Sequence, residues 1–195
     1  MKSLSTEACV ALAQKIGSPV RVASLFLLVL ACPELGMSQS GVPSSITGTA
    51  KVADGDTLTV NGRKIRLHGV DAWELRQSCP DGSGKPFPCG KLATAFLKDK
   101  IKNKQIECKP QVRDRYERLV GRCSLDGQDL GAMLVEHGWA VAYVHYSTSY
   151  LPLEQQAKNQ RLGGWRGLPL HEPTPPKTWR MTNKHTYRPR SDHQR

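Results

Sequence analysis

Two short runs in which apolar and polar residues alternate flank the dipeptide Asn61-Gly62, at residues 57–60 and 64–70. A period of two is typical of a half-buried strand. Asn and Gly both tolerate the positive φ that a type I′ turn requires, so this dipeptide favours a tight turn. The pattern therefore predicts a β-hairpin, preceded by a first strand near residues 46–52.

Apolar residues recur at helical spacing in three later segments. Residues 91–102 contain neither Pro nor Gly, and residues 130–137 are followed by Gly138, a residue typical of helix C-termini. A third helix is predicted to begin at Pro152, whose ring suits the first turn, and to end at Gly163.

Two further strands are predicted at residues 105–109 and 119–125, on either side of a basic loop at residues 113–118. Short strands followed at intervals by helices favour an α+β fold that is mainly β. We expect residues 41–165 to form one domain, a small closed β-barrel with helices packed on its outside.

The first 40 residues have a different character. An apolar segment at residues 22–31 follows several basic residues. It is shorter than the roughly 20 residues that span a bilayer and suits the centre of a secretory signal. We therefore predict an export signal at residues 1–40, with small residues before Gly41 that suit cleavage, and a secreted or periplasmic protein. The alternatives are an uncleaved membrane anchor and a lipidated Cys32.

The chain after Trp165 is rich in proline and basic residues and poor in aliphatic ones. Such a segment buries too little apolar surface to order itself, so residues 166–195 are predicted to be a disordered tail. Its charge would assist the binding of a polyanion, and a tail without a role is the alternative.

The charge of the chain favours a polyanionic partner. Its 28 Lys and Arg against 17 Asp and Glu give a net charge of +11, which suits nucleic acid or an anionic membrane surface. Aromatic residues make up only 6% of the chain. This content is too low to suggest base stacking along a long single strand as the main mode of binding. We expect contacts with phosphates instead.

Four cysteines follow the leader, and four cysteines allow three pairings. Short loops favour Cys79 with Cys89, across the loop at residues 75–90, and Cys108 with Cys123, on adjacent strands. The close Cys-x-x-Cys spacing of a zinc site is absent. Two disulfides would agree with export, because they persist in oxidising compartments.

The predicted hairpin carries acidic residues that its own geometry does not bring together. Across the turn, Asp56 lies opposite Leu67, and Asp71 follows Leu67 by four residues. A straight strand would therefore place Asp71 roughly 13 Å from Asp56, at about 3.3 Å per residue. A solvated charged rim is the simpler interpretation of such a pattern. The curvature and tilt of a small barrel, however, would bring the two carboxylates close to each other.

If the two carboxylates converge, their chemistry points to phosphodiester hydrolysis. Asp56 and Asp71, with no sulfur or imidazole nearby, would form a hard-oxygen site suited to Ca²⁺ or Mg²⁺. Arg66 and Arg118 would grip a phosphate and stabilise the charge that develops on it. Glu74 would then activate or orient the attacking water.

Four motifs in one order carry a resemblance to a known family. They are Asp54-Gly55-Asp56-Thr57, Ile65-Arg66-Leu67 with Val70-Asp71-Ala72-Trp73-Glu74, Asp114-Arg115-Tyr116-Glu117-Arg118, and the closing segment at residues 154–165. Over residues 47–165 the chain resembles the staphylococcal nuclease family. The resemblance implies an OB-fold barrel of five strands with three helices. It also implies a Ca²⁺-dependent endonuclease that cleaves DNA and RNA with little sugar or sequence preference and leaves 3′-phosphate ends.

The resemblance also implies a role for individual positions. Asp56 and Asp71 match the calcium carboxylates, and Ala72 matches the residue whose backbone carbonyl binds the same ion. Glu74 matches the general base, and the phosphate-gripping pair is Arg66 with Arg118. Residues expected to contact substrate are Arg115, Tyr116 and Tyr143, with Tyr146 as an alternative to Tyr143.

Two positions depart from the family pattern: Trp73 stands where the family usually has Pro, and Glu117 where it usually has Gly. The competing hypothesis is a non-catalytic OB-fold module that holds nucleic acid without cutting it. The complete set of acids and arginines favours catalysis. A monomer is expected, and the sequence implies no protein partner.

Overall fold

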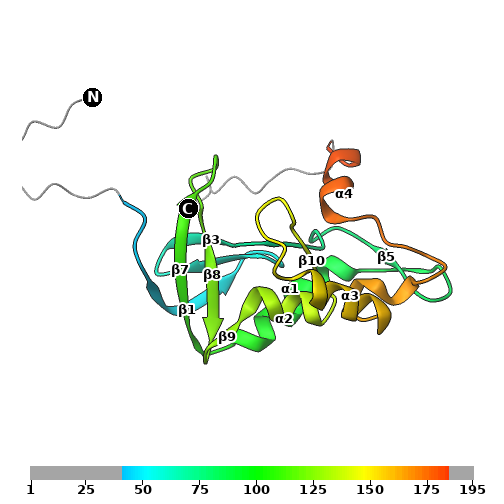
Figure 1. Ribbon diagram of the computed structural model, residues 1–195, viewed down its shortest axis with the longest axis horizontal. Coiled ribbons are helices and arrows are strands. Elements are labelled where there is room, and N and C mark those ends of the chain that lie inside the picture. Colours follow the sequence, from blue (N-terminus) through cyan, green and yellow to red (C-terminus); the bar gives the residue numbers. More distant parts are fainter. Residues whose placement is uncertain (1–40, 185–195) are drawn as a thin grey trace, which may run out of the picture. The chain divides into compact units, whose positions relative to one another are not determined.

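The computed structural model describes residues 41–184 (Figure 1). The predicted export signal, the anchor and the lipidated Cys32 lie outside the described residues, as does the end of the tail from residue 185. Among the described residues, no helix has the length and apolar character needed to span a lipid bilayer.

Five strands form a closed barrel, in the order β3-β2-β1-β7-β8, and a parallel pairing of β3 with β8 completes the circle. A sixth short strand, β9 (Gln128–Asp129), extends β8 at the edge. This is the OB-fold that the sequence predicts. The bounds of the barrel strands are β1 (Ile46–Val52), β2 (Thr57–Val60), β3 (Arg63–Leu67), β7 (Gln105–Arg113) and β8 (Leu119–Leu125).

The hairpin β2-β3 has the predicted turn and register. Asn61 and Gly62 both have positive φ, 48° and 75°, and Thr57 lies opposite Arg66. The ladder continues one residue beyond β2, because the N–H of Leu67 donates to the carbonyl of Asp56 at 2.9 Å. The hairpin therefore delivers Asp56 and Arg66 to the same end of the barrel.

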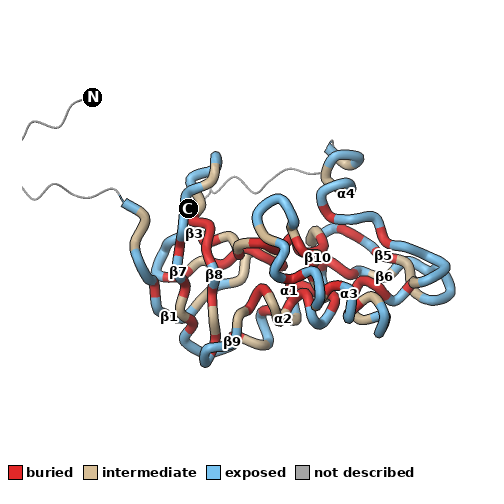
Figure 2. Tube along the Cα trace, in the orientation of Figure 1, coloured by how far each residue is buried: buried red, intermediate tan, exposed pale blue. Residues whose placement is uncertain are grey.

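Alternate apolar side chains of the strands fill the barrel. Leu58, Val60 and Ile65 are fully buried, and the buried positions follow the strands through the interior in Figure 2. A second, smaller apolar cluster surrounds Trp73 and Trp165, whose rings meet edge to face with centroids 5.1 Å apart.

The three predicted helices are present as α1 (Cys89–Ile101), α2 (Leu130–Glu136) and α3 (Leu151–Asn159). The side chain of Asp129 caps α2 by accepting hydrogen bonds from the N–H groups of Gly131 and Ala132. Outside the barrel, β4 (Val70–Ala72) pairs with β10 (Ala140–Ala142) and β5 (Cys79–Pro80) with β6 (Pro86–Phe87).

Both predicted disulfides are formed. Cys79 joins Cys89, and Cys108 joins Cys123. Cys108 and Cys123 stand directly opposite each other on β7 and β8. The first disulfide closes the loop that contains β5 and β6.

The prediction of a disordered tail from residue 166 is wrong for its first part. The short 3-10 helix η2 (Gly163–Gly167) continues past Trp165, and a fourth helix follows, α4 (Pro176–Thr182). The tail has few apolar residues of its own, but it packs on surfaces that the domain supplies. Pro173 and Pro176 are buried, and the carbonyl of Thr174 accepts a hydrogen bond from the buried Gln77 side chain at 2.6 Å.

Candidate active site

Asp56 and Asp71 converge on one guanidinium group, as the sequence analysis expects. Arg66 Nη1 donates to Asp56 Oδ1 at 3.1 Å, and Nη2 lies 3.1 Å from Asp56 Oδ2 and 2.8 Å from Asp71 Oδ1. Opposite charges within hydrogen-bond distance offset the cost of burying these carboxylates. The barrel end therefore carries two acids that share one arginine.

A tight turn after β3 brings Asp71 back to Asp56. Gly69 has a φ of +77°, a conformation that favours glycine, and the chain then folds back as β4. There the backbone N–H of Ala72 donates to Asp56 Oδ2 at 3.1 Å. The turn, rather than a gradual curvature of one long strand, closes the distance that a flat hairpin would leave.

The acids at this end of the barrel lie in a poorly hydrated environment. Asp56 is 5% exposed and Asp71 is 1% exposed. Burial, and then the charge of Asp56, raise the pKa of Asp54 to about 6. The charge of Asp56 is also the main cause that raises the pKa of Arg66 above its ordinary value. Arg66 is therefore a permanent cation at the centre of the cluster.

Glu74 lies near Asp71, since one nitrogen of Arg180 contacts both carboxylates. The chain between the two acids is held in place on either side of Glu74. The side chain of Trp73 is buried and donates to the carbonyl of Gly138 at 2.8 Å. The N–H of Glu74 donates to the side-chain oxygen of Gln77 at 3.1 Å. The unusual Trp73 thus anchors the segment in the second apolar cluster.

Burial is the largest influence on Glu74 and raises its pKa to about 7, although its ion pair with Arg180 acts in the opposite direction. A carboxyl group with such a pKa exchanges a proton near neutral pH. Perturbed titration next to a charged cluster is typical of functional sites.

Arg180 is the one residue of the cluster that sequence reasoning missed. It comes from α4 and bonds with both oxygens of Asp71 at 2.9 Å and with Glu74 Oε1 at 2.5 Å. The only signal in the sequence was the excess of basic residues after Trp165. That excess does not indicate which of them reaches the acids.

Arg118 is held apart from the acids. Its guanidinium pairs with Asp114 within its own loop, with Nε and Nη2 at 2.8 and 2.7 Å from Oδ2. Arg115 and Arg118 both lie over the ring of Tyr116, 4.9 and 5.4 Å from its centroid. The three predicted residues of this loop therefore form one basic and aromatic group. In the same loop Glu117 has a φ of +60°, the conformation for which glycine is the usual residue.

Tyr143 and Tyr146 lie together beside the β3-β4 turn. The N–H of Tyr143 donates to the carbonyl of Gly69 at 2.8 Å, and the two tyrosine rings are 5.1 Å apart. Tyr143 is half-buried and Tyr146 is exposed. Both therefore stay candidates for the residue that faces a nucleotide.

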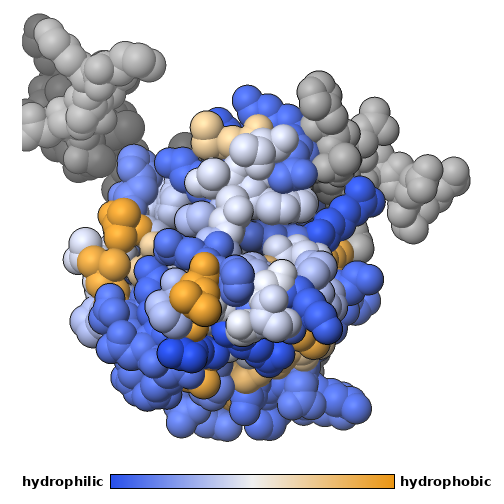
Figure 3. Space-filling model, turned by 90° about the vertical axis from the view of Figure 1, so that its right-hand side faces the viewer, coloured by the Kyte–Doolittle hydropathy of each residue, from blue (hydrophilic) through white to orange (hydrophobic). Residues whose placement is uncertain are grey.

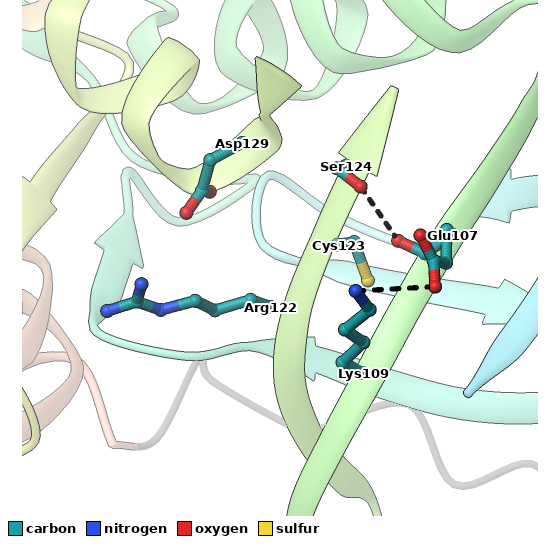
Figure 4. Close-up of a pocket in the computed structure, with 6 residues that line it drawn as sticks. All are labelled: Glu107, Lys109, Arg122, Cys123, Ser124 and Asp129. Atoms are coloured by element: carbon teal, nitrogen blue, oxygen red, sulfur yellow. Dashed lines mark hydrogen bonds and ion pairs between the residues drawn. The ribbon is translucent and has the colours of Figure 1, made fainter. Parts of the chain in front are cut away.

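A shallow pocket elsewhere on the barrel has a different lining (Figure 4). It lies over β7 and β8, where Lys109 pairs with Glu107 at 3.6 Å and charges of both signs alternate. Of the predicted residues only the disulfide-bonded Cys123 lines it, and no predicted catalytic, metal-binding or substrate-binding residue does. The pocket residues are Glu107, Lys109, Arg122, Cys123, Ser124 and Asp129.

The oxygen atoms of Asp56, Asp71 and the Ala72 carbonyl have the hard character that Ca²⁺ prefers. Within residues 41–184, no three Asp, Glu, His or Cys side chains group in a way that could hold a metal ion. Two carboxylates and a carbonyl would leave coordination positions of the ion for oxygens of water or substrate. The donor set fits Ca²⁺, whereas zinc would require nitrogen or sulfur ligands.

Comparison with known proteins agrees with this geometry. Residues 64–167 match the family described as staphylococcal nuclease homologue. The chain is 36% identical over 135 residues to the succinoglycan biosynthesis protein ExoI of Rhizobium meliloti, covering 68% of this chain and 71% of that protein. It is 33% identical over 137 residues to an uncharacterized endonuclease of Escherichia coli O157:H7, covering 67% and 81%. An uncharacterized endonuclease of Haemophilus influenzae is 29% identical over 141 residues, covering 69% and 72%.

Proposed function

The chain belongs to the staphylococcal nuclease family, and on that premise we propose that it is a Ca²⁺-dependent endonuclease. It would hydrolyse phosphodiester bonds of DNA and RNA with little sugar or sequence preference and leave 3′-phosphate ends. The observation that carries the proposal is the convergence of Asp56 and Asp71 on Arg66 at the end of an OB-fold barrel. The nuclease names of two relatives support it.

Arg66 would hold the phosphate. The two carboxylates orient its guanidinium, which like any arginine is charged at physiological pH, and they raise its pKa further. A guanidinium binds phosphate through parallel hydrogen bonds and stabilises negative charge that develops on the phosphoryl oxygens. Arg118 would act as the second phosphate ligand, exchanging Asp114 for the substrate when nucleic acid binds.

Glu74 would act as the general base. Its carboxylate would accept a proton from a water molecule that attacks phosphorus in line with the leaving oxygen. A pKa of about 7 suits this role, because a base is most effective when its pKa is near the working pH.

The metal would be held by Asp56, Asp71 and the backbone carbonyl of Ala72. When bound, Ca²⁺ supplies a Lewis acid that polarises a phosphoryl oxygen and neutralises charge. Substrate would also contact the exposed Arg115 and Tyr116 and the aromatic pair Tyr143 and Tyr146.

We also propose that the protein acts outside the cytoplasm, in the secreted or periplasmic space. Two disulfides support this location, because such bonds persist in oxidising compartments. The leader at residues 1–40 would direct export, and a retained leader or a lipidated Cys32 would instead tether the protein to a membrane.

The experiment uses the chain from residue 41 with end-labelled duplex DNA, single-stranded DNA and RNA in Ca²⁺. We expect internal cleavage of all three, with products that a polymerase extends only after phosphatase treatment. Asp71→Asn should bind the same substrates without cutting them. Wild-type protein that binds all three substrates and cuts none would favour the non-catalytic OB-fold module.

A further inference from the structure

Arg180 occupies the oxygen atoms through which the acids would act. Its Nη1 and Nη2 donate to Asp71 Oδ1 and Oδ2, both at 2.9 Å, in the parallel arrangement of a strong guanidinium-carboxylate pair. Its Nη1 also donates to Glu74 Oε1. Asp71 Oδ1 already accepts a hydrogen bond from Arg66, so both oxygens of this buried carboxylate are engaged.

The segment that delivers Arg180 is bound to the chain just before the disulfide-closed loop, outside the barrel strands. Gln77, which is 1% exposed, joins the two. Its side-chain nitrogen donates to the carbonyl of Thr174 at 2.6 Å, and its side-chain oxygen accepts from the N–H of Glu74. Gln77, two residues before the disulfide-bonded Cys79, therefore fixes the base and the C-terminal segment at one point.

The helix itself is attached mainly by polar contacts. Of the residues of α4, only Pro176 is buried, and Trp179 is half-buried. The face of the protein that bears α4 and β5 is mostly hydrophilic (Figure 3). Ion pairs to Asp71 and Glu74 are the contacts that join α4 to the acids, and a competing cation weakens contacts of this kind.

Arg180 and a divalent cation compete for the same oxygen of Asp71. Arg66 contacts only Oδ1, so a cation would bind Oδ2, which Arg180 now holds, and two like charges a few ångströms apart in a buried site repel each other strongly. Without a cation, Arg66 alone would balance two buried aspartates, so Arg180 supplies a second positive charge that offsets the cost of their burial. Arg180 and the divalent cation thus exclude each other from Asp71.

We propose that residues 168–184 form a strap that closes on the candidate active site in the absence of metal, with Arg180 as an internal counter-ion that Ca²⁺ must displace. The strap covers Glu74 as well as Asp71, so the closed state lacks both a free base and a free metal ligand. Binding of the cation opens the strap and exposes the site to nucleic acid. The inference rests on the proposed metal site.

The test measures Ca²⁺ affinity by calorimetry in the chain from residue 41 to residue 195, with no nucleic acid present. Arg180→Gln removes the competing charge and should bind Ca²⁺ roughly tenfold more tightly than wild type, within the usual range of coupling between two ligands. Lys177→Ala is the matched control, because it removes one positive charge from the exposed side of the same helix. Its affinity should equal that of wild type.

A second measurement follows the strap itself. In wild-type protein, hydrogen exchange of residues 168–184 should increase when Ca²⁺ saturates the site, and exchange in the barrel strands should not. Arg180→Lys keeps the charge but loses the parallel hydrogen bonds, so its affinity for Ca²⁺ should lie between those of wild type and Arg180→Gln. If circular dichroism shows that Arg180→Gln does not fold, the Ca²⁺ affinity of Arg180→Lys tests the proposal in its place.

An Arg180→Gln affinity equal to or weaker than wild type would overturn the strap, as would unchanged exchange of residues 168–184. Binding of Ca²⁺ by the variant alone would support it, and binding by neither would overturn it, since nothing would then compete. The proposed function fails separately. Tighter Ca²⁺ binding by Arg180→Gln, with no cleavage of nucleic acid by either wild type or the variant, would support the strap and refute the nuclease.

Discussion

The side chain of Asp56 accepts a hydrogen bond of 3.1 Å from the backbone N–H of Ala72, the residue after Asp71. This bond ties the strand that carries one acid to the loop that carries the other, and Arg66 bridges the two carboxylates. The position of the acids therefore depends on backbone geometry as well as on charge. Conservative changes at neighbouring functional side chains should alter the chemistry more than the fold.

Glu74→Gln should lower kcat by roughly 10²- to 10⁴-fold, the usual contribution of a general base. Gln keeps the shape and a hydrogen-bond acceptor for Arg180 but does not accept a proton from water. The circular dichroism spectrum should match that of wild type, and Ca²⁺ should bind at least as tightly, because the variant loses the charged contact between Glu74 and Arg180. Turnover within a few-fold of wild type would show that Glu74 is not the base.

The pH dependence of cleavage should have a rising limb that belongs to Glu74. The base works in its deprotonated form, so kcat/KM should increase as pH rises through about 7. A nearby bound cation favours the carboxylate and would move this limb to lower pH. Rates measured from pH 5 to pH 9 would contradict the assignment if wild type and Glu74→Gln gave profiles of the same shape.

The free energy of unfolding should also depend on the protonation of Glu74, and this contribution should fall as pH rises. Burial raises the pKa of Glu74 above its unfolded value of 4.5, so the folded state binds its proton more tightly than the unfolded chain. The stabilisation is complete below pH 4.5 and disappears as pH rises through about 7. Urea unfolding in chelator should show this loss in wild type and not in Glu74→Gln.

Arg118→Ala should lower kcat/KM by two or more orders of magnitude if the guanidinium leaves Asp114 to bind the scissile phosphate. Arg115→Ala is the matched comparison within the same loop. It removes an exposed charge over Tyr116 and should mainly raise KM, with an effect that salt reduces. Equal losses in the two variants would mean that Arg118 only attracts the polyanion.

The two disulfides should contribute to stability in different ways. Replacing Cys108 and Cys123 by Ser should lower the free energy of unfolding by about 3 kcal/mol, the value for a closed loop of about 15 residues. Replacing Cys79 and Cys89 should in addition increase hydrogen exchange of residues 168–184. Gln77, two residues before Cys79, binds Thr174, and its own carbonyl accepts a hydrogen bond from the N–H of Gly90, next to Cys89. A peptide that links Cys79 to Cys108 in mass mapping would refute the pairing.

Glu117→Gly should stabilise the protein by roughly 1 kcal/mol, because Glu117 has a φ of +60° and a residue with a Cβ pays for this conformation. Chemical denaturation of the two proteins measures the difference. Glu117→Ala is the control, since it removes the charge but keeps the Cβ, and it should not stabilise to the same extent. A destabilised Gly variant would contradict the account of this turn.

Local signals were sufficient for the hairpin and its register. Asn61-Gly62 determines the turn, and the turn places Thr57 opposite Arg66. The convergence of Asp56 and Asp71 was predicted for a less accurate reason, since curvature was expected and a turn at Gly69 was found. A single glycine in a strand pattern gives no indication of the direction in which the chain continues.

Arg180 could not have been predicted from composition. The tail is too poor in apolar residues to order itself, and that reasoning about the isolated segment holds. The segment is ordered instead by groups elsewhere in the chain, the side chain of Gln77 before the Cys79–Cys89 loop and the carboxylates of Asp71 and Glu74. Long-range docking of a polar segment depends on its partners, which the sequence of the segment does not contain.

The central claim is that the acids at the end of the barrel support metal-dependent hydrolysis. The most direct measurement is the initial rate of duplex DNA cleavage as free Ca²⁺ is set with a chelator. We expect a rate that saturates with Ca²⁺, falls to background in excess chelator and returns when Ca²⁺ is restored. A rate that chelation leaves unchanged would contradict it.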